Sequence, residues 1–202
     1  MLEARGISFG YGSRMLYENF NLVVSPGERI ALCAPSGFGK TTLCRILSEY
    51  ETPWAGEVRI DGEPLPTRRA CPVQLVSQHP ELAVDPRLRM REVLREAGSV
   101  PERVVLGLGI QERWKARYPH ELSGGELQRF CIARALAANP RYLIADEIST
   151  MLDALTQAQI WHFLLDECER RQMGLVFVSH SPSLTARIAT RAIDLADCAL
   201  GG

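Results

Sequence analysis

Lysine is scarce in this chain of 202 residues, which carries 2 lysines against 21 arginines. Acidic and basic residues nearly balance, so the formal net charge at pH 7 is only −1. That balance argues against a surface that binds nucleic acid by neutralising many phosphates. We therefore expect no nucleic-acid partner.

Long apolar runs are also missing. No run reaches the roughly eighteen residues that a membrane-spanning helix needs, and the N-terminal residues have no basic segment followed by an apolar one. We therefore expect neither a transmembrane segment nor an export signal. Hydrophobic residues make up 46% of the chain, a share that is ordinary for one soluble globular domain with a full core.

The cysteines lack any pattern of metal binding or redox chemistry. No pair has CxxC spacing, and none lies beside a histidine at metal-ligand spacing. We interpret them as buried thiols in a reducing cytosol. They are Cys33, Cys44, Cys71, Cys131, Cys168 and Cys198.

Apolar patterning predicts strands that alternate with helices along most of the chain. We expect strands at 2–8, 16–24, 29–33, 57–60, 73–77, 142–145 and 175–178. Helical spacing or turn signals place helices near 41–49, 126–137, 156–170 and 183–188. This alternation predicts a mostly parallel sheet with ligands at the carboxyl ends of its strands. Between residues 79 and 120, prolines separate short helical pieces at 90–97 and 102–106, which indicates a small helical insertion.

A glycine-rich loop follows the buried run at 29–33. It reads Ala34-Pro35-Ser36-Gly37-Phe38-Gly39-Lys40-Thr41-Thr42 and matches the phosphate-loop pattern GxxxxGK[ST], except that Ala34 replaces the first glycine. The glycines let backbone N–H groups turn toward an anion at the positive end of the following helix. We expect Lys40 to reach the outer phosphates and Thr41 to ligate Mg²⁺. The methyl group of Ala34 is harmless only at negative φ, and otherwise weakens binding.

Two carboxylates, Asp146 and Glu147, directly follow the apolar run at 142–145. Charges at the end of a buried strand are costly unless they serve a cation or a reaction. Asp146 fits the Mg²⁺ shell, and Glu147 can polarise the attacking water. His180 follows the run at 175–178 and can hydrogen-bond a γ-phosphate. A lone histidine is more often structural. The strand that leads to His180, however, is expected to lie beside the strands that precede Lys40 and Asp146, which favours a functional interpretation.

A second anion site is predicted at Leu122-Ser123-Gly124-Gly125-Glu126, which precedes a helix. Ser123 is a good N-cap, and the two glycines leave free N–H groups at the helix start uncovered. A plain serine cap with a flexible lead-in explains the same residues equally well.

This segment, with Leu127-Gln128-Arg129 after it, resembles the signature motif of ABC-type ATPases. The resemblance covers nearly the whole chain and implies further roles in the same order as in the family. Tyr11, 29 residues before Lys40, would stack on adenine, and Gln78 would be the Q-loop glutamine that contacts Mg²⁺ and the attacking water. The remaining family positions are the Walker B pair Asp146 and Glu147, the D-loop aspartate Asp153 and the switch histidine His180.

The resemblance implies a single ABC ATPase domain over residues 1–202. Its fold would be an α/β P-loop NTPase of the RecA-like type, with a mostly parallel sheet, an N-terminal antiparallel β-subdomain and a small helical insertion. Residues 1–78 and 121–202 would form the catalytic core, and residues 79–120 the insertion. In the family the signature of one subunit, with Leu122, Ser123, Gly124, Gly125, Glu126 and Gln128 here, closes over the nucleotide of a second subunit.

Three stretches resemble the nickel and oligopeptide permease branch, namely 73–80 with 85–87, 118–121, and 152–153 with 157–160. That branch implies a second ATPase subunit, more often different than identical, beneath two integral membrane permease subunits. It also implies a cytoplasmic position at the membrane and an extracytoplasmic solute-binding protein. The chain departs from the family after Glu147, where Ile148-Ser149-Thr150-Met151 replaces Pro-Thr-Ser-Ala.

We therefore expect a subunit that binds ATP and Mg²⁺, hydrolyses ATP and energises import of peptides, nickel or a metal chelate. One alternative is a soluble ABC ATPase without a transporter, such as the subunits that serve carbon–phosphorus bond cleavage. Another is a weakly active subunit that holds ATP as a clamp while its partner hydrolyses it. Co-purification with membrane proteins, and turnover with and without a partner, distinguish these three hypotheses.

Overall fold

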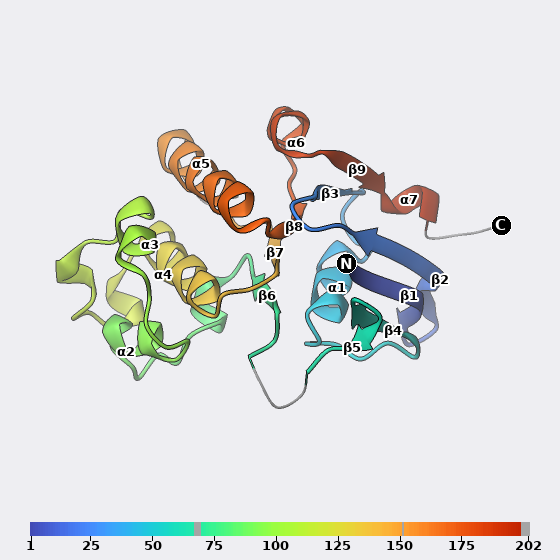
Figure 1. Ribbon diagram of the computed structural model, residues 1–202, viewed down its shortest axis with the longest axis horizontal. Helices are drawn as coiled ribbons and strands as arrows, with labels where there is room; N and C mark the ends of the chain where they lie inside the picture. The colour runs from blue at the N-terminus through green and yellow to red at the C-terminus, as the bar shows by residue number, and fades with distance from the viewer. Residues whose placement is uncertain (67–69, 151, 199–202) are drawn as a thin grey trace.

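Two β-sheets and the helices packed on them make up the computed structural model, which describes residues 1–66, 70–150 and 152–198 (Figure 1). An antiparallel sheet has the order β2-β1-β4-β5, and a parallel sheet has the order β6-β7-β8-β3-β9. The predicted α/β class with a parallel sheet and an N-terminal antiparallel part is confirmed. The antiparallel strands are β1 (Leu2–Tyr11), β2 (Arg14–Val24), β4 (Ala55–Ile60) and β5 (Glu63–Pro64). The parallel strands are β3 (Arg29–Cys33), β6 (Val73–Val76), β7 (Tyr142–Asp146), β8 (Gly174–Val178) and β9 (Arg191–Asp194).

The parallel sheet is covered on both faces. All five residues of β7 and all five of β8 are buried, which explains why these strands are apolar without alternation. Side chains nevertheless alternate between two cores, because successive residues of a strand point to opposite faces. Leu143 and Phe177 join the core on the helical side, whereas Ile144 and Val176 join the core beneath the antiparallel sheet.

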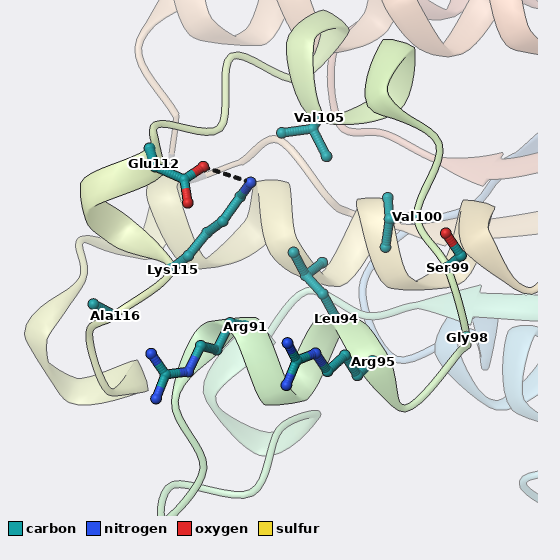
Figure 2. A pocket seen from close by; sticks show the side chains of 10 residues that line it. All are labelled: Arg91, Leu94, Arg95, Gly98, Ser99, Val100, Val105, Glu112, Lys115 and Ala116. Carbon is teal, nitrogen blue, oxygen red and sulfur yellow. Dashed lines mark hydrogen bonds and ion pairs between the residues drawn. The ribbon is translucent and has the colours of Figure 1, made fainter.

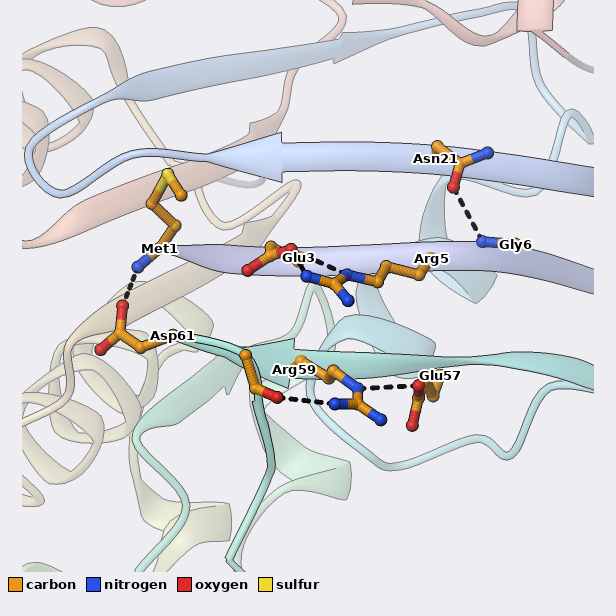
Figure 3. Close-up of polar contacts among 9 residues, drawn as sticks. Met1, Glu3, Arg5, Gly6, Asn21, Glu57, Arg59 and Asp61 are labelled. Atoms are coloured by element: carbon orange, nitrogen blue, oxygen red, sulfur yellow. Dashed lines mark hydrogen bonds and ion pairs between the residues drawn. The ribbon is translucent and has the colours of Figure 1, made fainter.

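The antiparallel sheet and helix α1 (Lys40–Leu47) fill the second core. The hairpin between β4 and β5 turns at Asp61 and Gly62, which both have positive φ, as the predicted turn requires. A bulge in β1 puts Gly6 at φ +62, and its freed N–H donates to Asn21 Oδ1 at 2.9 Å (Figure 3). Residues of this sheet share a core with α1 and hydrogen-bond to the loop that leads into it, so the sheet lies over both.

Short helices occupy the chain between β6 and β7. They gather at the opposite end of the molecule from the antiparallel sheet, with the longer α4 passing along the parallel sheet (Figure 1). The elements are η1 (Pro80–Leu82), α2 (Met90–Arg95), α3 (Glu102–Gly107), η2 (Glu112–Trp114), η3 (Pro119–Glu121) and α4 (Gly124–Ala137). After β7 come α5 (Ala154–Arg171), α6 (Pro182–Ile188) and α7 (Leu195–Cys198). Within the described ranges, no helix is long and apolar enough to cross a bilayer.

Several elements differ from the sequence-based expectation. Helix α4 begins at Gly124 rather than near Glu126, since the cap at Ser123 sets its start. Strands β5 and β9 were not predicted, because β5 has only two residues and β9 is mostly exposed and lacks an apolar alternation. The edge strand β9 pairs with β3 and completes the sheet beside the phosphate loop.

The cysteine interpretation is only partly met. Among the described side chains, Cys44, Cys131 and Cys168 are buried, whereas Cys33 and Cys71 are half-buried. Burial raises the pKa of Cys131 to about 11 and that of Cys168 to about 12. These two thiols are therefore protonated and unreactive at neutral pH.

Candidate functional site

A hollow of about 370 Å³ lies over the loop between β3 and α1. Most of the predicted nucleotide-binding residues line it, together with one of the two predicted carboxylates. Its lining consists of Tyr11, Arg14, Leu16, Ser36, Gly37, Gly39, Lys40, Thr41, Thr42 and Glu147. The fold thus brings the phosphate loop, the end of β1 and the end of β7 to one edge of the parallel sheet.

The phosphate loop has the backbone that its glycines permit. Gly37 and Gly39 have φ values of +83° and +86°. A side chain at Gly39 would also meet the Tyr17 hydroxyl at 2.8 Å, so glycine is required there for two reasons. Ala34 is not among the residues with positive φ, so the condition for a harmless alanine at this position is met.

The first turn of α1 presents free backbone donors. Its N-cap is Gly39, which supplies no capping side chain, so the N–H groups of the first turn have no cap from the chain itself. Lys40 is 7% exposed, and its Nζ donates to the carbonyls of Ala34 at 2.7 Å and Pro35 at 3.0 Å. A buried ammonium beside uncapped N–H groups forms an anion site, with the helix dipole adding to the attraction.

Tyr11 lies at the rim of this hollow, at the end of β1. Its side chain is 52% exposed, and its hydroxyl is 3.4 Å from Thr42 Oγ1. The ring of Phe9 contacts it edge-on, with 5.1 Å between centroids. An aromatic ring held in place from behind and exposed in front is suited to stacking on a planar base.

Asp146 ends β7 next to the hollow and is 3% exposed. Burial raises the pKa of its carboxyl group, and a hydrogen bond from Thr41 opposes that rise. Its Oδ1 has no hydrogen-bond partner among the residues that the structure describes. A buried, unpaired carboxylate oxygen beside a threonine hydroxyl fits a Mg²⁺ ion, which takes one or two carboxylates from the protein and completes its shell with phosphates and water. Within the described ranges, no group of three or more acidic, histidine or cysteine side chains could hold a metal by itself.

Glu147 and His180 meet at the edge of the same hollow. His180 Nε2 lies 2.7 Å from Glu147 Oε1, and the side chains are 53% and 14% exposed respectively. Strand β8, which leads to His180, pairs with both β7 and β3, as the sequence analysis expected. Glu147 has φ +51, a conformation that costs a non-glycine residue about 1–2 kcal/mol.

Gln78 lies between the two halves of the site. It lines one hollow together with Thr41 and Asp146, and a second, smaller one together with Gly124 and Glu147. The structure therefore places this glutamine next to the proposed Mg²⁺ ligands on one side and next to the start of α4 on the other.

The start of α4 is capped by its own residues. Glu126 N donates to Ser123 Oγ at 3.2 Å, and Ser123 N donates to Glu126 Oε2 at 2.8 Å, which forms a capping box. A side chain at Gly124 would meet no atom within 4 Å, whereas one at Gly125 would meet Leu152 at 2.9 Å. The backbone at Gly124 is therefore open to an approaching molecule.

The remaining signature residues have structural contacts. Gln128 is 3% exposed, and its Nε2 donates to Ser77 O at 3.2 Å, which ties α4 to the segment that carries Gln78. Leu122 packs against the core on the helical side. The signature residues do not line the phosphate-loop hollow of their own chain.

Asp153 caps helix α5. Its Oδ1 accepts from Leu155 N at 3.1 Å and Thr156 N at 2.9 Å, and these hydrogen bonds lower the pKa of its carboxyl group. Capping alone accounts for an aspartate at this position. Its predicted D-loop role stays a prediction, and Met151, in the same motif, lies outside the described residues.

Arg14 is a site residue that the sequence analysis missed. Its Nη2 donates to Gly37 O at 2.9 Å, and its side chain lines the phosphate-loop hollow. No sequence pattern predicts a cation at this point, because its position depends on how the hairpin of β1 and β2 lies over the loop.

The hollow of about 710 Å³ in the helical segment contains none of the predicted site residues (Figure 2). Arg91, Arg95 and Lys115 line it, and Lys115 Nζ is paired with Glu112 Oε2 at 2.7 Å. Its volume exceeds that of the phosphate-loop hollow, but the one carboxylate among its described lining residues, Glu112, is paired with Lys115. We therefore locate the functional site at the phosphate loop.

The fold and this site define a P-loop nucleotide-binding protein. A family profile described as ABC transporter matches residues 17–150. The chain belongs to this family.

The curated relatives are ATP-binding subunits of importers. The sulfate/thiosulfate import ATP-binding protein CysA of Rhodopseudomonas palustris is 36% identical over 95% of this chain and 59% of its own length. The glutathione import ATP-binding protein GsiA of Salmonella choleraesuis is 36% identical over 86% of the chain and 31% of its own length. A putative peptide import ATP-binding protein of Brucella ovis is 31% identical over 96% of the chain and 69% of its own length. The chain thus spans less than two thirds of the first two relatives. The glutathione and peptide importers agree with the predicted peptide permease branch.

A solved structure supports the same fold. The ATP-binding cassette MJ0796, determined as a dimer in a post-hydrolysis state with ADP and Pi, superposes with a TM-score of 0.81. The two sequences are 27% identical, and the match covers 96% of this chain and 94% of MJ0796. The antiparallel and parallel sheets are therefore those of an ABC ATPase cassette.

Proposed function

We propose that this chain binds ATP with Mg²⁺ and hydrolyses the γ-phosphate bond as the energising subunit of a membrane importer. The observation that carries the proposal is the convergence of Lys40, Glu147 and His180 on one sheet edge, with Glu147 lining the phosphate-loop hollow and His180 2.7 Å from it. A plain phosphate-binding loop needs neither the carboxylate nor the histidine.

Each side chain has a role that follows from its position. Lys40 and the free N–H groups of α1 bind the outer phosphates, while Tyr11 stacks on the base. Glu147 accepts a proton from the attacking water, and its contact with His180 holds the carboxylate in one orientation. Gln78 orients the water from the other side.

Mg²⁺, when bound, neutralises charge on the phosphate oxygens. Thr41 and Asp146 would hold it, with Gln78 adjacent. The unpaired Asp146 Oδ1 supports this assignment.

We propose further that the site is completed by a second ATPase subunit, in line with the dimer of MJ0796. The start of α4 faces outward at Gly124 and does not line its own phosphate hollow, so its free N–H groups suit the γ-phosphate of a partner's nucleotide. Bound ATP would then favour the closed pair, and hydrolysis would remove that preference. The branch favours two different subunits over two copies.

Two integral membrane permease subunits are the proposed partners of the helical segment at 79–120, on the cytoplasmic side of the membrane. A hollow of about 420 Å³ beside Gln78 carries two strongly exposed apolar side chains, Leu82 at 82% and Tyr50 at 72%. Such side chains suit a protein interface. The cargo class, delivered by a solute-binding protein, would be peptides, nickel or a metal chelate, and the peptide and glutathione relatives favour the first.

Glu147→Gln tests the catalytic assignment. The amide keeps the shape of the side chain but cannot accept the proton, so the variant should bind a fluorescent ATP analogue with unchanged affinity and release no phosphate. Phosphate release at the parent rate would contradict the assignment. Comparing turnover of the chain alone and with its co-purified subunits separates an importer subunit from a soluble ATPase or a nucleotide clamp.

A further inference from the structure

Glu147, the proposed general base, has a backbone conformation that its own side chain disfavours. Its φ is +51, in the left-handed region that suits glycine. A residue in such a conformation keeps it only when the surrounding structure holds it there. The contacts that hold Glu147 therefore bear on where its carboxylate points.

A four-residue turn at 147–150 supplies the first of these contacts. Thr150 N donates to Glu147 O at 3.3 Å, and Thr150 Oγ1 donates to the same carbonyl at 3.1 Å. Both bonds are local, so they shape the turn but do not attach it to the rest of the protein.

Ser149, inside this turn, makes the attachment. The residue is 6% exposed, and its Oγ accepts two hydrogen bonds from helix α5, one from Gln157 Nε2 at 2.9 Å and one from Trp161 Nε1 at 3.0 Å. A buried hydroxyl with two donors from one helix fixes the turn relative to that helix.

Trp161 also reaches the strand that leads to His180. It is 3% exposed, and its ring packs against Phe177 of β8, with 5.4 Å between centroids and an angle of 61°. Phe177 lies three residues before His180. The indole side chain of Trp161 thus contacts both the turn that carries Glu147 and the strand that leads to His180. The side chains of these two residues meet, with 2.7 Å between His180 Nε2 and Glu147 Oε1.

We propose that Ser149 and Trp161 are positioning residues that set the geometry of the Glu147–His180 pair. The inference rests on the catalytic roles proposed above for those two residues. Neither Ser149 nor Trp161 lines the phosphate-loop hollow, so their loss should change turnover without changing nucleotide affinity. The sequence supports no such role by itself, because a serine and a tryptophan twelve residues apart match no motif.

Three variants test the proposal in the assembly that supports parent turnover. Trp161→Phe keeps a ring against Phe177 but removes the N–H donor, and Ser149→Ala removes the acceptor. Trp161→Phe and Ser149→Ala should each lower turnover roughly tenfold or more, as small misplacements of catalytic groups do. Their affinity for a fluorescent ATP analogue should change by less than about twofold. Trp114→Phe is the matched control, because Trp114 is 6% exposed and its Nε1 has no partner in the part of the chain that the structure describes.

Two further measurements make the result unambiguous. Ser149→Thr retains a hydroxyl and should restore most of the turnover, and the double variant Ser149→Ala with Trp161→Phe should be no slower than the slower single variant, since both remove one shared bond. Parent turnover in Trp161→Phe, or a loss that Trp114→Phe matches, would overturn the proposal. So would parallel losses of turnover and affinity. Glu147→Gln, assayed alongside, reports separately on the proposed function: if it turns over normally, the catalytic assignment itself is wrong.

Discussion

The starts of helices α1 and α4 are both rich in glycine, yet they differ in how they are capped and in how exposed they are. The start of α1 follows Gly39, lacks a capping side chain and has Lys40 buried beside it. The start of α4 follows Ser123, which forms a full capping box with Glu126, and its backbone at Gly124 is open. The start of α1 thus lacks a side-chain cap and is enclosed, whereas the start of α4 has a side-chain cap and is exposed.

This difference shows how two anion-binding helix starts can have separate roles at one nucleotide site, the first in binding the nucleotide and the second in contacting a phosphate that another subunit holds. The α1 start needs an anion to satisfy its N–H groups, so nucleotide should bind there first and in a single chain. The α4 start is stable without a ligand and can meet a phosphate that another subunit carries. Substitutions at α1 should therefore change affinity, and substitutions at α4 should change turnover.

The largest expected effect is at the exposed helix start. Ser123→Arg places a long cation where a second subunit would approach, so it should prevent closure. Turnover should fall by about a hundredfold or more, as when a donor to the transition state is removed, while nucleotide binding to the single chain is retained. Phosphate-release kinetics and an equilibrium titration with a fluorescent ATP analogue measure the two quantities. Normal turnover in this variant would show that α4 does not take part in the site.

Lys40→Ala should have the next largest effect, this time on binding. It removes the buried ammonium from the enclosed helix start, and with it charge-assisted hydrogen bonds to phosphate. Affinity for ATP should fall roughly tenfold to a hundredfold. Isothermal titration gives the dissociation constant directly, with Lys115→Ala as the control because Lys115 lies in the helical segment. An unchanged constant for Lys40→Ala would mean that nucleotide binds elsewhere.

Arg14→Ala should weaken binding less, because this cation is exposed and screened. We expect a loss of up to about fivefold in ATP affinity, growing at low ionic strength. Arg14→Lys should recover part of it, since the charge returns without the planar guanidinium group. If the loss is the same for adenosine as for ATP, Arg14 acts on the shape of the loop rather than on the phosphates.

Ser123→Ala should have the smallest effect, and on stability rather than affinity. The alanine removes the side-chain acceptor of the capping box, which stabilises a helix by about 0.5–2 kcal/mol. Chemical denaturation of the nucleotide-free chain would show it as a lowered midpoint at unchanged slope. A drop in the ATP affinity of the single chain would contradict the claim that only the α1 start binds nucleotide within one chain.

Much of this comparison could be predicted from the sequence. The fully buried strands β7 and β8 are short apolar runs with polar residues at their carboxyl ends, so the sequence alone predicts Asp146, Glu147 and His180 at one edge of the sheet. The cap at Ser123 was also predicted, because serine before glycines and a glutamate three residues later form a local signature.

What the sequence did not reveal depends on contacts between distant segments. Arg14 meets Gly37 across 23 residues, and Trp161 meets Ser149 across 12, so neither contact follows from a local period. The sequence shows that Ile148-Ser149-Thr150-Met151 departs from the family pattern but assigns these residues no contact. In the structure, Ser149 is buried and accepts two hydrogen bonds from α5. Contacts between residues far apart in the sequence, rather than local apolar patterning, determine the roles of Arg14, Ser149 and Trp161.

The structure of the Glu147→Gln variant with Mg²⁺ and ATP, solved with its second ATPase subunit, tests the central claim most directly. The account predicts that the polyphosphate lies between Lys40 and the start of α1 in one subunit and a signature helix start of the other subunit. A nucleotide bound by one subunit alone, with the Ser123 helix start of this chain far from any phosphate, would contradict it.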